Sequence, residues 1–112
     1  MEIAKGHVII ADLDPRMGTE PGKVRPVVVV QSDLLNGVHP STVVCPVSTR
    51  IRPGARLLRV HLSAGEGGLK EASDILVDQV RAVDNRRFVR VLGKISRRSL
   101  VRLVGNLRIL LD

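Results

Sequence analysis

The sequence predicts a mainly β, α+β protein that ends in a single helix, and three observations lead to this prediction. Short runs rich in β-branched and apolar residues recur between residues 7 and 95, separated by segments rich in glycine and proline. After residue 96 the apolar residues recur at the spacing of a helix. The 112 residues are 44% hydrophobic and 26% charged, so residues 1–112 suit one globular domain. We expect a small antiparallel barrel or sheet with the helix packed against it.

Three strands are predicted in the first half of the chain. Residues 7–13 form the first. The segment 15–23 contains prolines and glycines without apolar periodicity, which predicts a loop long enough to bind a ligand. Residues 24–31 form the second strand, whose four consecutive valines predict burial on both faces. A connection over residues 32–41 leads to the third strand at residues 43–47.

The second half predicts three more strands and the helix. A basic loop over residues 50–56 precedes strands at residues 58–62, 75–83 and 88–95. We expect the strand at 75–83 to carry Asp78 and Arg81. Ser96 is the predicted N-cap of the helix. An apolar stripe indicates that this helix packs on the sheet, and its members are Leu100, Leu103, Val104, Leu107, Leu110 and Leu111.

The net charge of +7 lies almost entirely in the second half of the chain. Residues 1–49 hold four cations and five acids, whereas residues 50–112 hold 14 cations and six acids. Most of the cations are arginines, which bind phosphate and carboxylate groups through two parallel hydrogen bonds. This distribution favours a polyanionic partner, either nucleic acid or an acidic protein segment. Phe88 is the only aromatic residue, so an RNA could not be held by base stacking on aromatic side chains.

Several classes of site are excluded by the sequence. His7, His39 and His61 lie in separate segments without metal-ligand spacing, and Cys45 is a lone cysteine in an apolar run. The sequence has no P-loop, no dinucleotide-binding glycine motif and no nucleophile elbow. We therefore expect no metal and no cofactor.

Neither a membrane span nor a signal peptide is predicted. The longest central apolar run is the four valines of the second strand, far short of the ~20 residues that a bilayer span requires. The first six residues have neither an apolar core nor a cleavage site. We expect a cytoplasmic protein that does not bind membranes.

The remaining residues suit a chemistry that needs only charge and positioning, such as RNA cleavage by the 2′-hydroxyl of the substrate. The protein must then bind the phosphate, stabilise the extra negative charge of the transition state and help to move two protons. Arg25, Ser48, Thr49 and Asp78 are of the required types and lie at or near the edges of predicted strands.

Four motifs in order resemble those of the MazF/PemK (Kid) toxin family. The first motif combines Asp12-Leu13-Asp14-Pro15, Gly18-Thr19-Glu20 and Arg25-Pro26-Val27-Val28-Val29-Val30-Gln31; the others are Val44-Cys45-Pro46-Val47-Ser48-Thr49-Arg50, Gly68-Leu69-Lys70-Glu71 and Val77-Asp78-Gln79-Val80-Arg81-Ala82-Val83-Asp84. The resemblance implies a compact SH3-like antiparallel β-barrel with a C-terminal helix, of the MazF/Kid/CcdB type, that forms a homodimer. It also implies a metal-independent, sequence-specific endoribonuclease that cuts single-stranded mRNA, leaving a 2′,3′-cyclic phosphate and a 5′-hydroxyl. The implied partner is an acidic, MazE-like antitoxin.

The same resemblance assigns roles to individual residues. Arg25 matches the catalytic arginine that contacts the scissile phosphate, and Asp78 matches an acidic site residue of some members. Ser48 and Thr49 match a hydroxyl pair whose usual order is threonine then serine, so which of the two contacts the phosphate stays open. Leu76 replaces an arginine of some members, which removes one acid–base pair. We further expect RNA contacts from Arg16, Glu20, Lys23, Gln31, Arg50, Arg52, Arg56, Gln79 and Arg81.

Two alternative functions remain. A non-catalytic RNA- or ribosome-binding barrel would explain the arginines but not the motifs around Arg25, Ser48 and Asp78. A gyrase poison of the CcdB type would share the barrel, but such proteins use an aromatic residue near the C-terminus, and residues 107–112 of this chain contain none.

Overall fold

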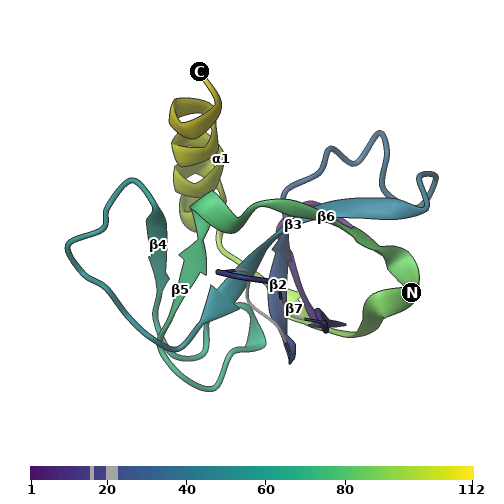
Figure 1. Cartoon of the computed structure of the whole chain (residues 1–112), viewed down its shortest axis with the longest axis horizontal. Helices are drawn as coiled ribbons and strands as arrows, with labels where there is room; N and C mark the ends of the chain where they lie inside the picture. The colour runs from purple at the N-terminus through teal and green to yellow at the C-terminus, as the bar shows by residue number, and fades with distance from the viewer. Residues whose placement is uncertain (16, 20–22) are drawn as a thin grey trace.

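The computed structural model describes residues 1–15, 17–19 and 23–112 and contains an antiparallel sheet with one α-helix at the C-terminal end (Figure 1). In chain order the elements are β1 (His7–Asp12), β2 (Val24–Val29), β3 (Ser41–Ser48), β4 (Arg59–Leu62), the 3₁₀ helix η1 (Glu66–Gly68), β5 (Ser73–Leu76), the 3₁₀ helix η2 (Val77–Gln79), β6 (Arg81–Asp84), the 3₁₀ helix η3 (Asn85–Arg87), β7 (Phe88–Lys94) and α1 (Arg97–Leu111). The predicted fold class is confirmed.

The strands form one sheet with the order β4-β5-β3-β2-β1-β7, and β6 pairs with the beginning of β3. Within the described residues no pairing joins β4 to β7, so the barrel is open. Its ends meet instead where η1, in the connection from β4 to β5, packs on β7. A methyl group on Gly93 would lie only 2.8 Å from the backbone of Gly67, so this contact requires glycine.

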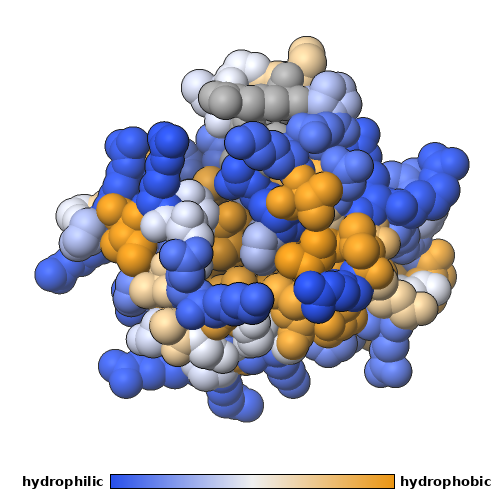
Figure 2. Space-filling view, turned by 90° about the horizontal axis from the view of Figure 1, so that it is seen from below, coloured by the Kyte–Doolittle hydropathy of each residue, from blue (hydrophilic) through white to orange (hydrophobic). Residues whose placement is uncertain are grey.

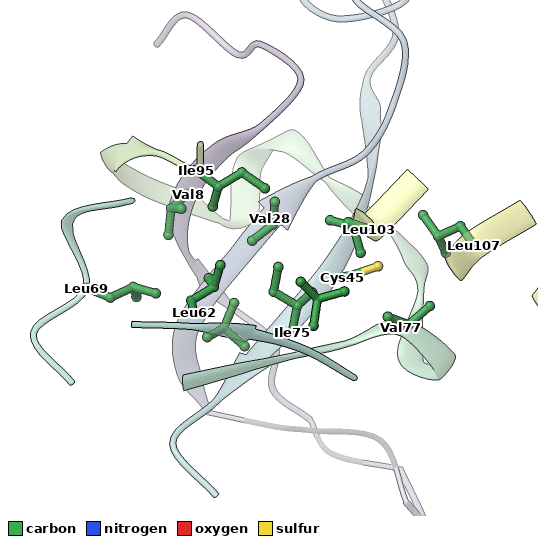
Figure 3. Close-up of a cluster of buried hydrophobic side chains, with 12 residues drawn as sticks. Val8, Val28, Cys45, Leu62, Leu69, Ile75, Val77, Ile95, Leu103 and Leu107 are labelled. Carbon is green, nitrogen blue, oxygen red and sulfur yellow. The ribbon is translucent and has the colours of Figure 1, made fainter. Parts of the chain in front are cut away.

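Two apolar clusters lie on opposite faces of the sheet. The larger one contains Val8, Val28 and Cys45 and is completed by α1, whose Leu103 and Leu107 reach toward it (Figure 3). In the second cluster Val27 and Val29 are buried with residues of β1, β3 and β6. Successive valines of β2 therefore enter different clusters, which confirms the predicted burial on both faces.

The predicted strand over residues 75–83 is wrong as a single element, because η2 divides it into β5 and β6. β5 pairs with the end of β3 (Ser48 opposite Asp74), whereas β6 pairs with its beginning (Val44 opposite Arg81). Apolar residues stand on both sides of the Asp78-Gln79 pair, and this hides the turn. Asp78 consequently lies on the exposed turn between two strands.

The helix begins as predicted, because the Ser96 hydroxyl accepts a hydrogen bond from the Ser99 N–H at 3.1 Å. The predicted apolar stripe is only partly covered: Leu103 and Leu107 are buried, but Leu110 and Leu111 are exposed. No helix in the described ranges has the length and apolar character needed to cross a bilayer.

Candidate functional site

Arg25 and Ser48 are brought to the same level of the sheet by the register of β2 and β3. The two strands pair antiparallel, with Val27 opposite Pro46. Continuing this register by two residues puts Arg25 opposite Ser48, and both lie on one face because residues two apart on a strand share a face. Arg25 is half-buried, and its backbone pairs on the other side with Ala11 of β1. The guanidinium is thus carried by a strand fixed on both sides.

The same row continues across two more strands. Ser48 is paired with Asp74 of β5, and Asp74 is paired with His61 of β4. Arg25, Ser48, Asp74 and His61 therefore form a row across four neighbouring strands, which we call the cross-strand row. The four members lie far apart in the sequence, and the antiparallel pairing of the strands brings them together.

Asp74 is the most buried member of the cross-strand row, with 1% of its surface exposed. Its carboxylate accepts hydrogen bonds from the Arg52 N–H (2.8 Å), from Arg59 Nη1 (3.3 Å) and from His61 Nδ1 (3.2 Å). Because a carboxylate only accepts, the proton in the last bond belongs to His61 Nδ1. Sequence reasoning missed Asp74, Arg59 and His61. The available signal was an aspartate directly before the apolar run that begins at Ile75, because a carboxylate that becomes buried beside such a run requires partners.

Ser48 and Thr49 are separated by the sheet. Ser48 is half-buried, lies in the cross-strand row, and its Oγ accepts a hydrogen bond from the Arg50 N–H at 3.1 Å. Thr49 is exposed and lines a cavity of about 300 Å³ together with Pro26 and Leu92 (the Thr49 cavity). Ser48 is therefore the hydroxyl on the face of Arg25.

Asp78 is exposed and lines a cavity of about 260 Å³ (the Asp78 cavity), which also brings together Gln79 and Arg52 from the predicted set. Leu76 contributes an apolar wall, as expected of an aliphatic residue there. Burial raises the pKa of the Cys45 thiol to about 12, and the negative charge of Asp78 adds to this shift. The thiol is therefore neutral and unreactive near neutral pH.

A third hollow of about 250 Å³ is lined by four arginines, and we call it the arginine cavity. Arg52 and Arg56 come from the loop before β4, as predicted. The structure adds residues from β4, β5 and α1, so that the full polar lining is Arg52, Arg56, Arg59, His61, Asp74 and Arg102. Arg50 is exposed in the same loop, and its carbonyl accepts a hydrogen bond from Arg59 Nη1 at 2.8 Å.

The other predicted RNA contacts are distributed unevenly. Lys23 is exposed just before β2. Arg81 is half-buried opposite Val44, four residues from Ser48 along β3. Gln31 lies apart from the site: it is only 8% exposed, and its amide binds other groups of the protein. Arg16 and Glu20 lie outside the described residues.

Around the cross-strand row and its cavities, arginines outnumber carboxylates in the described part of the chain. Apolar surface bordered by hydrophilic side chains is visible when the molecule is seen from below (Figure 2). No group of three or more His, Cys, Asp or Glu side chains could hold a metal ion among the residues that the structure describes. The arrangement can bind an anion and place a guanidinium and a hydroxyl beside it.

Comparison with known proteins gives consistent matches over nearly the whole chain. Residues 4–111 match the family model described as PemK-like, MazF-like toxin of type II toxin-antitoxin system. Endoribonuclease EndoA of Bacillus subtilis is 36% identical over 88 residues, which cover 79% of this chain and 76% of that protein.

Solved structures have the same fold. MazF of Deinococcus radiodurans (Form-I) superposes with a TM-score of 0.84 and 28% identity over 99% of this chain and 97% of that one. MazE-MazF of the same organism (Form-I) gives a TM-score of 0.78 at 26% identity, covering 99% and 97% of the two chains. The toxin MazF-mt6 of Mycobacterium tuberculosis, at 21% identity and a TM-score of 0.79 over 95% and 96%, shares the fold.

Proposed function

The chain belongs to the family of PemK-like, MazF-like toxins of type II toxin-antitoxin systems, and from this premise we propose that it is an endoribonuclease that cuts single-stranded mRNA at a specific sequence without a metal ion. The observation that carries the proposal is the antiparallel register of β2 and β3, with Val27 opposite Pro46, which when continued by two residues supports a position for Arg25 opposite Ser48 on one face of the sheet. The name of the EndoA relative supports the activity. The surplus of arginines around the site supports a polyanionic substrate.

The proposed reaction uses the nucleophile of the substrate. The ribose 2′-oxygen loses its proton and bonds to the adjacent phosphorus, the bond from phosphorus to the 5′-oxygen breaks, and that oxygen takes up a proton. The products are a 2′,3′-cyclic phosphate and a 5′-hydroxyl. The five-coordinate phosphorane between them carries an additional negative charge, which a fixed guanidinium stabilises more strongly than the ground state.

Roles follow from position. Arg25 is charged throughout the accessible pH range, so we assign it charge stabilisation at the phosphorane. We assign the Ser48 hydroxyl a hydrogen bond donated to a phosphate oxygen, because Ser48 shares the face of Arg25 whereas Thr49 lines a separate cavity. Asp78, whose cavity also contains Arg52 and Gln79, contacts the substrate beside the scissile group.

Sequence choice is assigned to the two loops that flank these residues, 15–23 and 50–56. The proposed RNA contacts in the described part are Lys23, Arg50, Arg52, Arg56, Gln79 and Arg81. Glu20 belongs to the same proposal through the family motif, and Arg16 through its place in the loop 15–23.

The proposed partners are a second copy of the chain and an acidic antitoxin. MazE-MazF complexes among the similar structures support the antitoxin. The arginine-rich face supports an acidic inhibitor that competes with RNA for the same charges. An mRNA substrate would place this activity in the cytoplasm.

The test is cleavage of synthetic single-stranded RNA by the purified protein in EDTA, followed by sequencing of the cut ends. We expect cuts at one short sequence, cyclic phosphate ends, and no cutting of DNA of the same sequence, which lacks the 2′-hydroxyl. A requirement for magnesium would contradict the charge-only mechanism. RNA binding without cleavage would instead favour the non-catalytic barrel.

A further inference from the structure

The arginine cavity lies beyond the residues to which the proposed reaction assigns a chemical role. Its walls come from the loop 50–58, from β4 and β5, and from α1, so it forms only when the helix is packed on the sheet. The helix is also tied to this loop, because Asn106 Nδ2 donates a hydrogen bond to the Arg56 carbonyl at 3.0 Å. The cavity is thus a feature of the folded tertiary structure.

The charge of the cavity is strongly one-sided. Four guanidinium groups and one imidazole line it, and Asp74 is the acidic side chain among its described lining residues. The carboxylate of Asp74 is buried and already accepts three hydrogen bonds. The guanidiniums of Arg52, Arg56 and Arg102 are therefore left facing an accessible hollow of about 250 Å³ with excess positive charge.

Asp74 also fixes the geometry of the cavity. It holds the backbone of Arg52 through the N–H, and it holds the His61 ring through Nδ1. Half of the His61 side chain is exposed, so the part of the ring that does not bind Asp74 is accessible to a ligand. A site whose cationic walls are positioned before a ligand arrives loses less conformational entropy on binding.

The cavity is continuous with the proposed cleavage site. Asp74 and His61 are the last two members of the cross-strand row that begins with Arg25 and Ser48. Neighbouring strands lie roughly 4.8 Å apart, so His61 lies on the order of 10 Å from Ser48 along the row. Arg52 and Arg59 line both the arginine cavity and the Asp78 cavity. An extended chain that occupies one hollow passes directly into the other.

We propose that the arginine cavity binds a second backbone phosphate of the RNA, one or two nucleotides from the phosphate that is cut, with Arg102 and His61 as its contacts from α1 and β4. This inference rests on the proposed function. A phosphate fits better than a carboxylate of a protein because the cavity continues the row that holds the scissile phosphate, and phosphates recur regularly along RNA. Arg56 and Arg59 complete the cationic lining.

The experiment combines a chemical change in the RNA with a change in the protein. The probe is an RNA oligonucleotide with the mapped cleavage sequence and a 2′-deoxy nucleotide at the cut, so that it binds without being cleaved. A neutral methylphosphonate replaces one phosphate at a time, and binding is measured for the wild-type protein, for Arg102→Gln and for Arg98→Gln. Arg98 is exposed on the same helix and does not line the cavity, which makes it the matched control.

We expect one position beside the scissile phosphate at which the methylphosphonate weakens wild-type binding roughly tenfold, as for a lost charge-assisted hydrogen bond. In Arg102→Gln the same replacement should weaken binding by less than about twofold, because the guanidinium that contacts this phosphate is already absent. Arg98→Gln keeps the full wild-type loss. His61→Gln gives a second, independent variant and weakens the effect at the same position.

Equal losses in wild type and Arg102→Gln at every position would overturn the proposal, as would a loss of coupling in Arg98→Gln. Suppose that an acidic peptide binds the cavity and that no methylphosphonate position depends on Arg102. This result would overturn the proposal in favour of a protein ligand. If the protein binds and cuts RNA but no phosphate position is coupled to Arg102, only this inference is removed. Absence of both binding and cutting removes the proposed function as well.

Discussion

The two ends of β3 are both polar, but they use polar groups in opposite ways. At the Ser41 end the polar groups bind one another: Thr42 Oγ1 donates to Asn85 Oδ1 at 2.7 Å, Gln31 Nε2 donates to Asn36 Oδ1 at 2.9 Å, and Asp84 is paired with Arg86 at 3.0 Å. At the Ser48 end the groups are charged, cations exceed carboxylates, and the excess faces open hollows. Mutually satisfied polar groups hold a fold together, whereas surplus charge at a cavity is available for a ligand.

The largest expected effect comes from removing the central cation of the Ser48 end. Arg25→Ala should reduce kcat/KM for RNA cleavage by roughly a thousandfold or more, since it removes a fixed charge from the phosphorane. Cleavage assays in EDTA measure the loss, and circular dichroism checks that the fold persists. Arg25→Lys, which keeps the charge but not the planar fork, should recover only part of the activity. Full activity in Arg25→Ala would contradict the assigned role.

The next effect separates the two hydroxyls. Ser48→Ala should lower the cleavage rate by roughly ten- to a hundredfold, because it removes a donor on the face of Arg25. Thr49→Ala should change it less than about threefold, since Thr49 lines a different cavity. Single-turnover rates of the two variants decide the matter. The reverse order would show that the register beyond Val27 does not continue as we infer.

At the Ser41 end the same kind of change should affect stability and leave chemistry alone. Thr42→Val removes the buried hydroxyl that donates to Asn85 and should lower the free energy of unfolding by about 1–2 kcal/mol. Urea denaturation measures this loss, and kcat/KM of the folded variant should match wild type. A large loss of activity with unchanged stability would erase the contrast between the two ends.

The smallest effect concerns Cys45, which lies in β3 between them. Because burial raises the pKa of its thiol to about 12, the reactive thiolate is nearly absent at pH 8. Iodoacetamide should leave native protein unlabelled at this pH and label it quickly in denaturant, as read by mass spectrometry. Rapid native labelling would show that the strand opens on that timescale.

Local chemistry made much of the fold predictable. The β-branched run of β2 identified a strand buried on both faces, and Ser96 followed by periodic leucines identified α1. The break at η2 was missed because its two polar residues, Asp78 and Gln79, stand between apolar segments that were interpreted as one strand. Periodicity detects which face a residue occupies, but it does not detect a change of pairing partner.

The candidate site was predictable where residue type, the basic loop 50–56 or a family motif marked it. Arg25, Ser48 and Asp78 were identified in this way, whereas Asp74 and His61 were not. Their partnership spans 13 residues and depends on the register of β4 against β5, which turn geometry and packing set. The motif also included Gln31, whose amide the structure uses within the protein.

The glycine contact between η1 and β7 has a consequence for the neighbouring Thr49 cavity, which Gly68, Leu69 and Leu92 help to line. Where η1 meets β7, the width of the cavity is set by two main chains that are in contact without intervening side chains. Substitutions of the lining residues can change the chemistry of the cavity, but they cannot bring the main chains of η1 and β7 closer together. An alanine at Gly93 would put a methyl group 2.8 Å from the Gly67 backbone, so η1 and β7 would have to move apart, and the hollow would widen without any change in the identity of its lining residues.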